Sequence, residues 1–280
     1  MSTPRLTALT TLALLAFAAN SLLCRLALQG HHIDASRFTA LRLGSGALML
    51  AALGWRRDAP DGPRGSWLSA LALFAYAAGF SFAYLSLPTA TGALLLFGAV
   101  QASMMSVAIA RGTRFAAHEW VGFVLALAGL VGLLAPGLSA PAPGGALVML
   151  GAGVAWGVYS LRGRGAGDAT RVTAGNFLRA APMALALGVW NPAGATADVN
   201  GVVCAVASGA LASGLGYAVW YTVLPNIRAT HAAIVQLSVP VIAAIGGYAF
   251  LGEPVTVRLG VAAAAILGGI AMVVAGRRAG

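Results

Sequence analysis

The chain has 280 residues, of which 59% are hydrophobic and only 9% are charged. Soluble domains carry about 25% charged residues, so this chain has too few to cover a globule in water and is expected to lie in lipid. Its net charge of +10 comes from 17 arginines, with no lysine. These arginines lie in short loops without a basic face or a recognition motif, which argues against a nucleic-acid partner.

Apolar runs follow one another along the whole chain, each close to the length of about 20 residues that a helix needs to cross the hydrocarbon core. Because lipid does not tolerate unpaired backbone groups and the runs do not alternate, we predict helices rather than a β-barrel. The first run extends to Leu28, which favours a retained span over a cleaved signal peptide. The predicted spans are 6–28, 36–54, 67–87, 90–110, 118–134, 146–161, 173–190, 200–221, 229–250 and 257–275.

Arginines are distributed unequally between the two ends of these ten spans. With the N-terminus inside the cell, only three lie at outer ends, namely Arg25, Arg37 and Arg258. Positive loops remain in the cytoplasm, so both termini are predicted to be cytoplasmic. The absence of lysine and the abundance of Ala, Gly and Arg suggest a GC-rich bacterial genome, so the predicted location is the bacterial inner membrane. The cytoplasmic segments hold Arg5, Arg56, Arg57, Arg64, Arg111, Arg114, Arg162, Arg164, Arg171, Arg228, Arg277 and Arg278.

Two stretches of the chain, residues 79–97 and 214–235, follow the same pattern. Each has an apolar, aromatic run, then Leu-Pro, then a short polar patch and a second apolar run. The two prolines, Pro88 and Pro225, are 137 residues apart. The similarity predicts an internal repeat.

The repeat divides the chain into two halves, residues 1–138 and 139–280. Five spans per half is an odd number, so the second half must enter the membrane in the opposite sense. We therefore predict an all-α polytopic membrane protein with ten transmembrane helices, arranged as two inverted five-helix repeats. Inverted repeats recur in secondary transporters, where the substrate site lies between the halves.

The sequence LGEPVTVRLG precedes the last span and contains Gly252, Glu253 and Pro254. Together with the ten spans and the repeat, it resembles the drug/metabolite transporter superfamily, in particular the EamA-type exporters. The aromatic content is similar to that of the aromatic amino acid exporters of this superfamily. The first half departs from the pattern, because Phe115 stands near the position of the glutamate. The resemblance implies a transporter fold and a small-molecule substrate.

Polar side chains deep in spans are rare and tend to face the bundle interior. Asn20, Gln101 and Gln236 are such residues, and each amide can donate and accept hydrogen bonds to a substrate. The alternative is inter-helix contact, worth about 0.6–2 kcal/mol each. Pro240 follows Gln236 by four residues and removes its helical partner, which predicts either a broken helix at a binding site or a packing kink.

Aromatic side chains recur at helical spacing in several spans. They predict an aromatic-lined cavity for planar or bulky apolar solutes, with core packing or an interfacial belt as the alternative. His231, at the start of the ninth span, could titrate near neutral pH and is a further candidate, unless it is an interfacial neutral histidine. The aromatic candidates for substrate binding are Tyr76, Phe80, Tyr84, Phe97, Trp156, Tyr159 and Tyr217.

Arg42 and Arg179 lie one to two turns inside their spans, at matched repeat positions in FTALR and GNFLR. Burying an arginine in a membrane costs at least about 3 kcal/mol, so each must hold a carboxylate or cap backbone carbonyls. The matched positions favour a structural role. Pro182 frees the carbonyl of Leu178, a predicted partner of Arg179. The predicted structural or hinge residues are Arg42, Pro88, Arg179, Pro182, Pro225 and Pro240.

The acidic residues all fall in loops or at span ends, so no carboxylate for proton coupling is visible and facilitated export is favoured. Motifs of ATPases, metalloproteases and serine hydrolases are absent, so neither an enzyme nor an ATPase partner, cofactor or metal is expected. Cys24 and Cys204 are predicted to be buried fillers.

We therefore predict a secondary transporter in contact with lipid. It would export small metabolites, including aromatic amino acids, by alternating access around a central cavity. The alternatives are a carrier for a sugar derivative, an amine or a lipophilic drug, and a membrane enzyme or scaffold.

Overall fold

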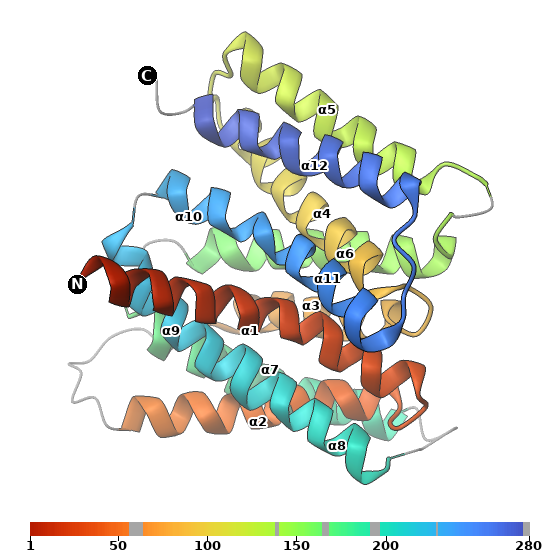
Figure 1. Ribbon diagram of the computed structural model, residues 1–280. Coiled ribbons are helices and arrows are strands. Elements are labelled where there is room, and N and C mark those ends of the chain that lie inside the picture. The colour runs from red at the N-terminus through yellow and green to blue at the C-terminus, as the bar shows by residue number, and fades with distance from the viewer. Residues whose placement is uncertain (56–63, 138–139, 164–167, 191–196, 228, 277–280) are drawn as a thin grey trace.

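The computed structural model describes residues 1–55, 64–137, 140–163, 168–190, 197–227 and 229–276, and this part of the chain is helical (Figure 1). One isolated β-bridge joins Ile33 to Ala197. The helices are α1 (Thr3–Gln29), α2 (Ala35–Trp55), α3 (Trp67–Ala83), α4 (Thr89–Ala110), α5 (Ala117–Leu134), α6 (Pro143–Gly163), α7 (Ala169–Trp190), α8 (Val199–Val206), α9 (Gly216–Val223), α10 (Ala229–Gln236), α11 (Ser238–Leu251) and α12 (Val257–Gly276).

Each predicted span coincides with helical structure. The eighth is α8 and α9 joined by a π-helical segment, Ala207–Leu215, which the sequence pattern did not predict. Among the described residues, eight helical stretches are long and apolar enough to cross a membrane, so the chain is a multi-pass membrane protein. Helices α2 and α3 are not among the eight, and α3 has only 17 residues.

Prolines mark the ends and breaks of several helices. Pro88 is the N-cap residue of α4, and Pro225 lies in the 3₁₀ turn Leu224–Asn226 that follows α9. The ninth span is interrupted, because α10 ends at Gln236 and α11 begins at Ser238. This break stands where the missing N–H of Pro240 predicts it. Pro182, in contrast, lies inside α7, which continues through it.

The predicted contact between Arg179 and the carbonyl of Leu178 was wrong. Nη1 of Arg179 donates instead to the carbonyl oxygens of Gly175 (2.8 Å) and Arg64 (2.7 Å). Side chains of a helix point toward its N-terminus, so an arginine reaches the carbonyl one turn before it rather than that of its neighbour. The guanidinium also lies over the ring of Trp67. Arg179 thus caps carbonyls, as a structural role predicts.

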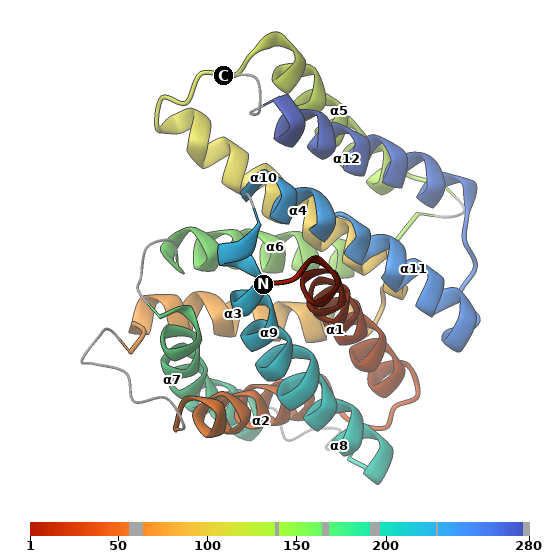
Figure 2. The ribbon, with the colours of Figure 1, turned by 60° about the vertical axis from the view of Figure 1, so that its left-hand side comes forward.

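The helices pack against one another in pairs (Figures 1 and 2). Helix α5 packs on α12 along one side of the bundle, and α2 packs on α7 along the other. Further contacts join α3 to α6, α4 to α11, and α1 to α8 and α9. Glycines permit the closest approaches: a Cβ on Gly122 of α5 would stand 2.5 Å from the carbonyl oxygen of Gly269 on α12.

The start of α1 and the end of α12 lie at the same end of the bundle, which we call the terminal end, and the turn after α1 marks the opposite, distal end (Figure 1). The described arginines separate as predicted. Arg25, Arg37 and Arg258 belong to the distal end, and the terminal end carries Arg5, Arg64, Arg111, Arg114, Arg162 and Arg171. The other arginines of the orientation argument lie outside the described residues, namely Arg56, Arg57, Arg164, Arg228, Arg277 and Arg278.

Candidate binding cavity

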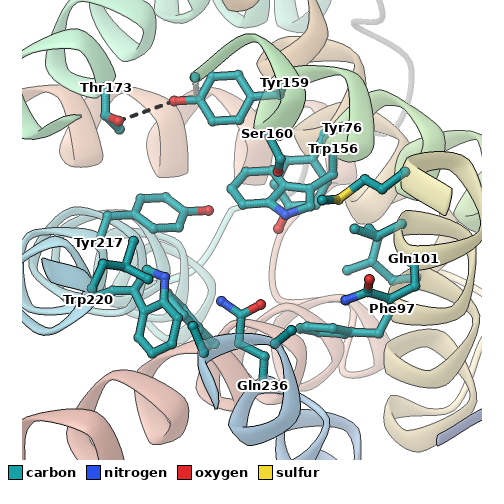
Figure 3. Close-up of a pocket in the computed structure, with 18 of the residues that line it drawn as sticks. Tyr76, Phe97, Gln101, Trp156, Tyr159, Ser160, Thr173, Tyr217, Trp220 and Gln236 are labelled. Atoms are coloured by element: carbon teal, nitrogen blue, oxygen red, sulfur yellow. Dashed lines mark hydrogen bonds between the residues drawn. The ribbon is translucent and has the colours of Figure 1, made fainter. Parts of the chain in front are cut away.

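A cavity of about 820 Å³ lies within the bundle, between α1, α3, α4, α6, α7, α9, α10 and α12 (Figure 3). Its lining includes Gly163, Ala169 and Leu224, which are at or next to helix ends at the terminal end. Toward the distal end the lining stops at Ser21 and Phe80. The cavity is therefore reached from the terminal end, and packed helices close it at the other.

All but two of the predicted binding residues line this cavity. Tyr84 and His231 do not. Successive residues four apart are offset by about 40° around the helix axis. Tyr84 therefore lies outside the face that Tyr76 and Phe80 share. Tyr84 is fully buried and donates to the Thr89 carbonyl, and His231 is exposed. The lining contains Asn20, Tyr76, Phe80, Phe97, Gln101, Trp156, Tyr159, Tyr217 and Gln236.

Aromatic rings form a continuous wall on one side of the cavity. Trp156 lies between Tyr76, at 4.6 Å between ring centroids, and Tyr217, with which it stacks at 5.5 Å and 18°. Tyr217 also stacks with Tyr221, with 6.2 Å between the two ring centroids. Offset stacking and edge contacts of this kind fit a planar or bulky apolar group, and the ring faces also attract a cation such as an ammonium group.

Polar groups face the same space from several helices. Gln101 of α4 and Gln236 of α10 point their amides toward it, and the hydroxyl of Tyr217 extends into it (Figure 3). Each amide has both donors and acceptors, so the pair can bind an ammonium or a carboxylate. Gln236 is the last residue of α10, next to the helix break at Leu237. The cavity therefore combines an apolar wall with a few directed polar groups.

The sequence argument missed four polar lining residues, Ser21, Ser160, Thr173 and Asn176. Thr173 Oγ1 accepts from the hydroxyl of Tyr159 (3.3 Å) and pairs with the hydroxyl of Tyr221 (2.9 Å). Thr173 and Asn176 are three residues apart, so they share one face of α7. That spacing of polar groups within an apolar run is the signal that could have found them.

Asn20 forms part of the wall and also connects helices. Its Oδ1 accepts from the hydroxyls of Ser208 (2.8 Å) and Ser213 (3.3 Å) in the π-helical segment. Asn20 therefore lines the cavity and also makes inter-helix hydrogen bonds, so the two alternatives do not exclude each other. The π-helical segment places the two serines toward Asn20, and such segments are frequent at functional sites.

Arg42 lies behind the wall, outside the lining, with only 2% of its surface exposed. Its Nη2 donates to the hydroxyl of Tyr76 at 3.0 Å, and its Nε is 3.5 Å from the hydroxyl of Ser213. The guanidinium lies 4.7 Å from the ring centroid of Phe80. Its Nη1 has no hydrogen-bond partner in the described part of the chain.

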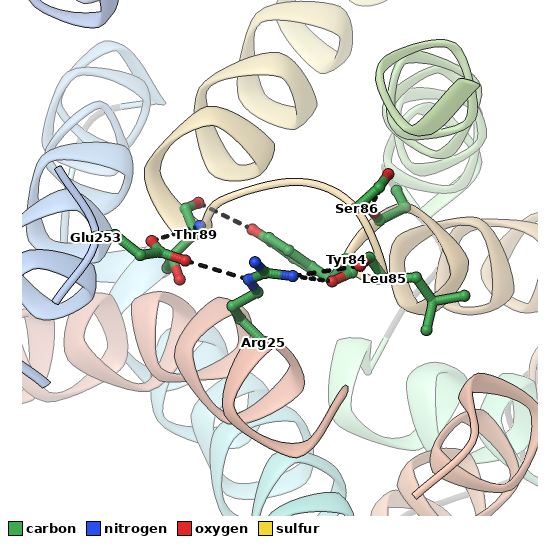
Figure 4. Close-up of polar contacts among 7 residues, drawn as sticks. Arg25, Tyr84, Leu85, Ser86, Thr89 and Glu253 are labelled. Carbon is green, nitrogen blue, oxygen red and sulfur yellow. Dashed lines mark hydrogen bonds and ion pairs between the residues drawn. The ribbon is translucent and has the colours of Figure 1, made fainter. Parts of the chain in front are cut away.

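An ion pair closes the distal end of the bundle (Figure 4). Nε of Arg25 on α1 lies 3.2 Å from Oε1 of Glu253, and its Nη1 donates to the carbonyl of Tyr84 at 2.9 Å. Oε2 of Glu253 accepts from the backbone N–H of Thr89 at 2.7 Å. Gly252 has φ +63° and ends α11, turning the chain so that Glu253 follows the helix directly. The Gly252–Glu253 turn thus joins α1, α4 and α11.

Comparisons with known proteins agree with this architecture. Residues 143–275 match the EamA-like transporter family. An uncharacterized protein of Pseudomonas aeruginosa PAO1, PA1977, is 56% identical over 270 residues, which are 96% of this chain and 94% of that protein. A crystal structure of a protein with 22% identity superposes with a TM-score of 0.68 over 97% of this chain and 98% of that chain, which shows a common fold.

Proposed function

We propose that this chain is a secondary exporter of amino acids, including aromatic ones, because residues 143–275 match the EamA-like transporter family. The cavity carries this proposal. It offers stacked rings to an apolar side chain and two amides to the ammonium and carboxylate groups. The described lining residues include no Asp or Glu, which disfavours a simple amine.

The packing of the helices supports an inverted repeat of residues 1–138 and 139–280. If each span is exchanged with the one five places along, the contact of α3 with α6 becomes that of α1 with α8 and α9. The pairs α2 with α7 and α5 with α12 remain themselves under this exchange. A two-fold axis relating the halves has this property. Two such halves can open a shared cavity to either side in turn.

Alternating access is supported by the unequal ends of the cavity. It opens at the terminal end, while the Arg25–Glu253 pair and its backbone partners join helices at the distal end. A second pair, His32 with Asp198 at 2.6 Å, also joins α8 to the turn after α1 at that end. With cytoplasmic termini this is an inward-open conformation, ready to accept solute from the cytoplasm.

Reporter fusions test the orientation. Green fluorescent protein fused after Gly280 should fluoresce in bacterial cells, and alkaline phosphatase at the same position should be inactive, because the positive segments hold that end in the cytoplasm. A fusion in the turn between α1 and α2 should give the reverse pattern. Active phosphatase at the C-terminus would contradict the inward-open assignment.

Substitution of Trp156 tests the role of the cavity. In proteoliposomes, Trp156→Ala should raise the concentration for half-maximal tryptophan flux by about tenfold, since the ring stacks between two partners and each aromatic pair is worth about 0.5–1.5 kcal/mol. Trp120→Ala is the matched control, because Trp120 lies on α5, is 44% exposed and is not part of the lining.

The flux assay in proteoliposomes is repeated with phenylalanine, threonine, a sugar and a lipophilic dye in place of tryptophan. Flux of the sugar or the dye without any amino acid would replace the proposed substrate class with another carrier function. Equal flux of tryptophan in both tryptophan variants would remove the aromatic wall from the site. No flux of any solute would contradict the proposal.

A further inference from the structure

We infer that Arg42 is the counter-charge for a carboxylate on the transported solute, an inference that rests on the proposed transport function. Arg42 lies in α2, directly behind Tyr76 and Phe80, which form the cavity wall. It is not itself a lining residue, so the solute reaches it when the side chain of Tyr76 moves aside. The proposal thus assigns a chemical group of the substrate to a particular side chain.

The hydrogen bonds of Arg42 leave its charge incompletely paired. A guanidinium has five N–H donors. In the described residues these meet only two hydroxyl oxygens, those of Tyr76 and Ser213, and the latter at 3.5 Å. Nη1 is buried without an acceptor, and none of the ion pairs among the described residues includes Arg42. Buried charges are normally paired, so this one is poised for an anion.

The comparison with Arg179 shows that position in the repeat does not explain Arg42. Arg179 occupies the matched place in the second half and donates to two backbone carbonyls, those of Arg64 and Gly175. Among the described residues, Arg42 donates to no backbone carbonyl and instead contacts two cavity-wall side chains, Tyr76 and Phe80. The same sequence position therefore caps backbone in one half and faces the cavity wall in the other.

The contacts of Tyr76 identify where the anion would bind. Its hydroxyl oxygen accepts from Nη2 of Arg42 at 3.0 Å, so a neutral oxygen stands where a carboxylate oxygen would make a stronger, charge-assisted bond. Asn20, a lining residue, is connected to the same guanidinium through Ser213. Rotation of Tyr76 would open this polar corner to the cavity.

A carboxylate fits better than a phosphate. Arg42 is one cation, and the described lining residues contain no Arg or Lys that would balance a dianion. The aromatic faces of Trp156 and Tyr217 continue the same wall beside Tyr76 and can attract an ammonium group. In a zwitterionic solute the carboxylate would then bind Arg42, and the ammonium group would bind the aromatic faces.

The test compares solutes that differ only in the carboxylate. Two pairs of solutes compete with labelled tryptophan in a flux assay in proteoliposomes: tryptophan with tryptamine, and phenylalanine with phenethylamine. Indole-3-propionate, which keeps the carboxylate but lacks the ammonium group, is a further competitor. We expect Arg42→Gln to reduce the preference for the carboxylate member of each pair by about tenfold, the scale of one charge-assisted hydrogen bond. Arg179→Gln is the control and should leave that preference unchanged. Arg42→Lys should retain part of it.

A second variant and a binding measurement keep the inference testable if Arg42→Gln does not fold. Tyr76→Phe removes the hydroxyl that occupies the guanidinium and should raise affinity for the carboxylates, whereas a purely structural Arg42–Tyr76 contact predicts no change in the preference. Ligand-induced stabilisation of the detergent-purified protein, measured by its unfolding temperature, reports binding without transport.

The outcomes separate the two claims. Carboxylate-selective stabilisation without flux would support the role of Arg42 and overturn the proposed transport of these solutes. Flux with an equal loss for both members of each pair in Arg42→Gln, and no change in Tyr76→Phe, would overturn the role of Arg42 alone. A wild-type protein that neither moves nor is stabilised by the carboxylates would overturn both.

Discussion

Replacing Glu253 with glutamine is expected to lower the unfolding temperature of the purified protein by about 5–10 °C. The carboxylate binds Arg25 at 3.2 Å and the backbone N–H of Thr89 at 2.7 Å, and both side chains of the ion pair are largely buried. Removing one partner of a buried pair costs about 3–5 kcal/mol, and partial exposure places this one near 2–3 kcal/mol. For a chain of this size each kcal/mol shifts the unfolding temperature by about 2–4 °C.

The surroundings of Glu253 explain why an amide does not replace it. Glutamine is neutral and has one acceptor oxygen, so it can accept from Arg25 or from the N–H of Thr89, and its NH2 group would face the other donor. Gly247 leaves the space for this side chain, because a Cβ there would stand 2.6 Å from Oε2 of Glu253. The space left by Gly247, the carboxylate of Glu253 and the turn at Gly252 are therefore all needed for this contact between α1, α4 and α11.

The chain provides its own reporter for this measurement. Cys24 and Cys204 are free and buried, so a thiol-reactive fluorophore will label them only as the protein unfolds. Asp34→Asn is the matched control: its carboxylate accepts from the backbone N–H of Arg37 at 3.0 Å and lies 3.6 Å from the guanidinium of the same residue, so its contacts are local to the start of α2. Its loss should cost about 1 kcal/mol or less.

The double variant Arg25→Gln, Glu253→Gln completes a thermodynamic cycle. If the two side chains are coupled, the double variant should be more stable than the sum of the single effects predicts. Strict additivity would contradict the ion pair as a joint contact. If distal closure also depends on the pair, Glu253→Gln should increase labelling from outside the cell of a cysteine placed at Ser21, in a background without the native cysteines.

The sequence predicted the helices well because their signals are local. Apolar length placed every span, and the missing N–H of Pro240 located the break after Gln236. Aromatic spacing placed Tyr76 and Phe80 on the cavity wall but failed one turn later at Tyr84. A stripe of residues four apart drifts around the helix, so only its first members share a face.

The environments of matched residues could not be predicted in the same way. Arg42 and Arg179 lie in similar sequence contexts, yet one contacts cavity-wall rings and the other contacts carbonyls. Their neighbours come from helices distant in the chain, which local pattern does not specify. The π-helical segment that presents Ser208 and Ser213 to Asn20 was missed for a similar reason, since its sequence of small residues is also compatible with an ordinary helix.

Gly269→Ala is expected to separate α5 from α12 and to destabilise the protein by about 1–3 kcal/mol, the usual cost of overpacking a close contact. A Cβ on Gly269 would meet the backbone carbonyl of Gly122 and stand 2.7 Å from the backbone nitrogen of Ala126, and backbone atoms cannot rotate away as a side chain does. Leucine at this position should prevent the pair from forming and abolish recovery of folded protein. In lipid, where close packing rather than burial from water holds helices together, no other force would restore the contact.

Gly268→Ala is the control, with an expected change in stability of the opposite sign. Gly268 is exposed and a Cβ there meets nothing within 4 Å, so the substitution should gain helix propensity of up to about 1 kcal/mol or leave stability unchanged. The unfolding temperatures of the two alanine variants, measured in the same detergent with the buried cysteines as reporters, should therefore move apart. Equal values would mean that α5 and α12 do not approach each other at Gly122 and Gly269, and the tightest helix pair of this bundle would have to be placed elsewhere.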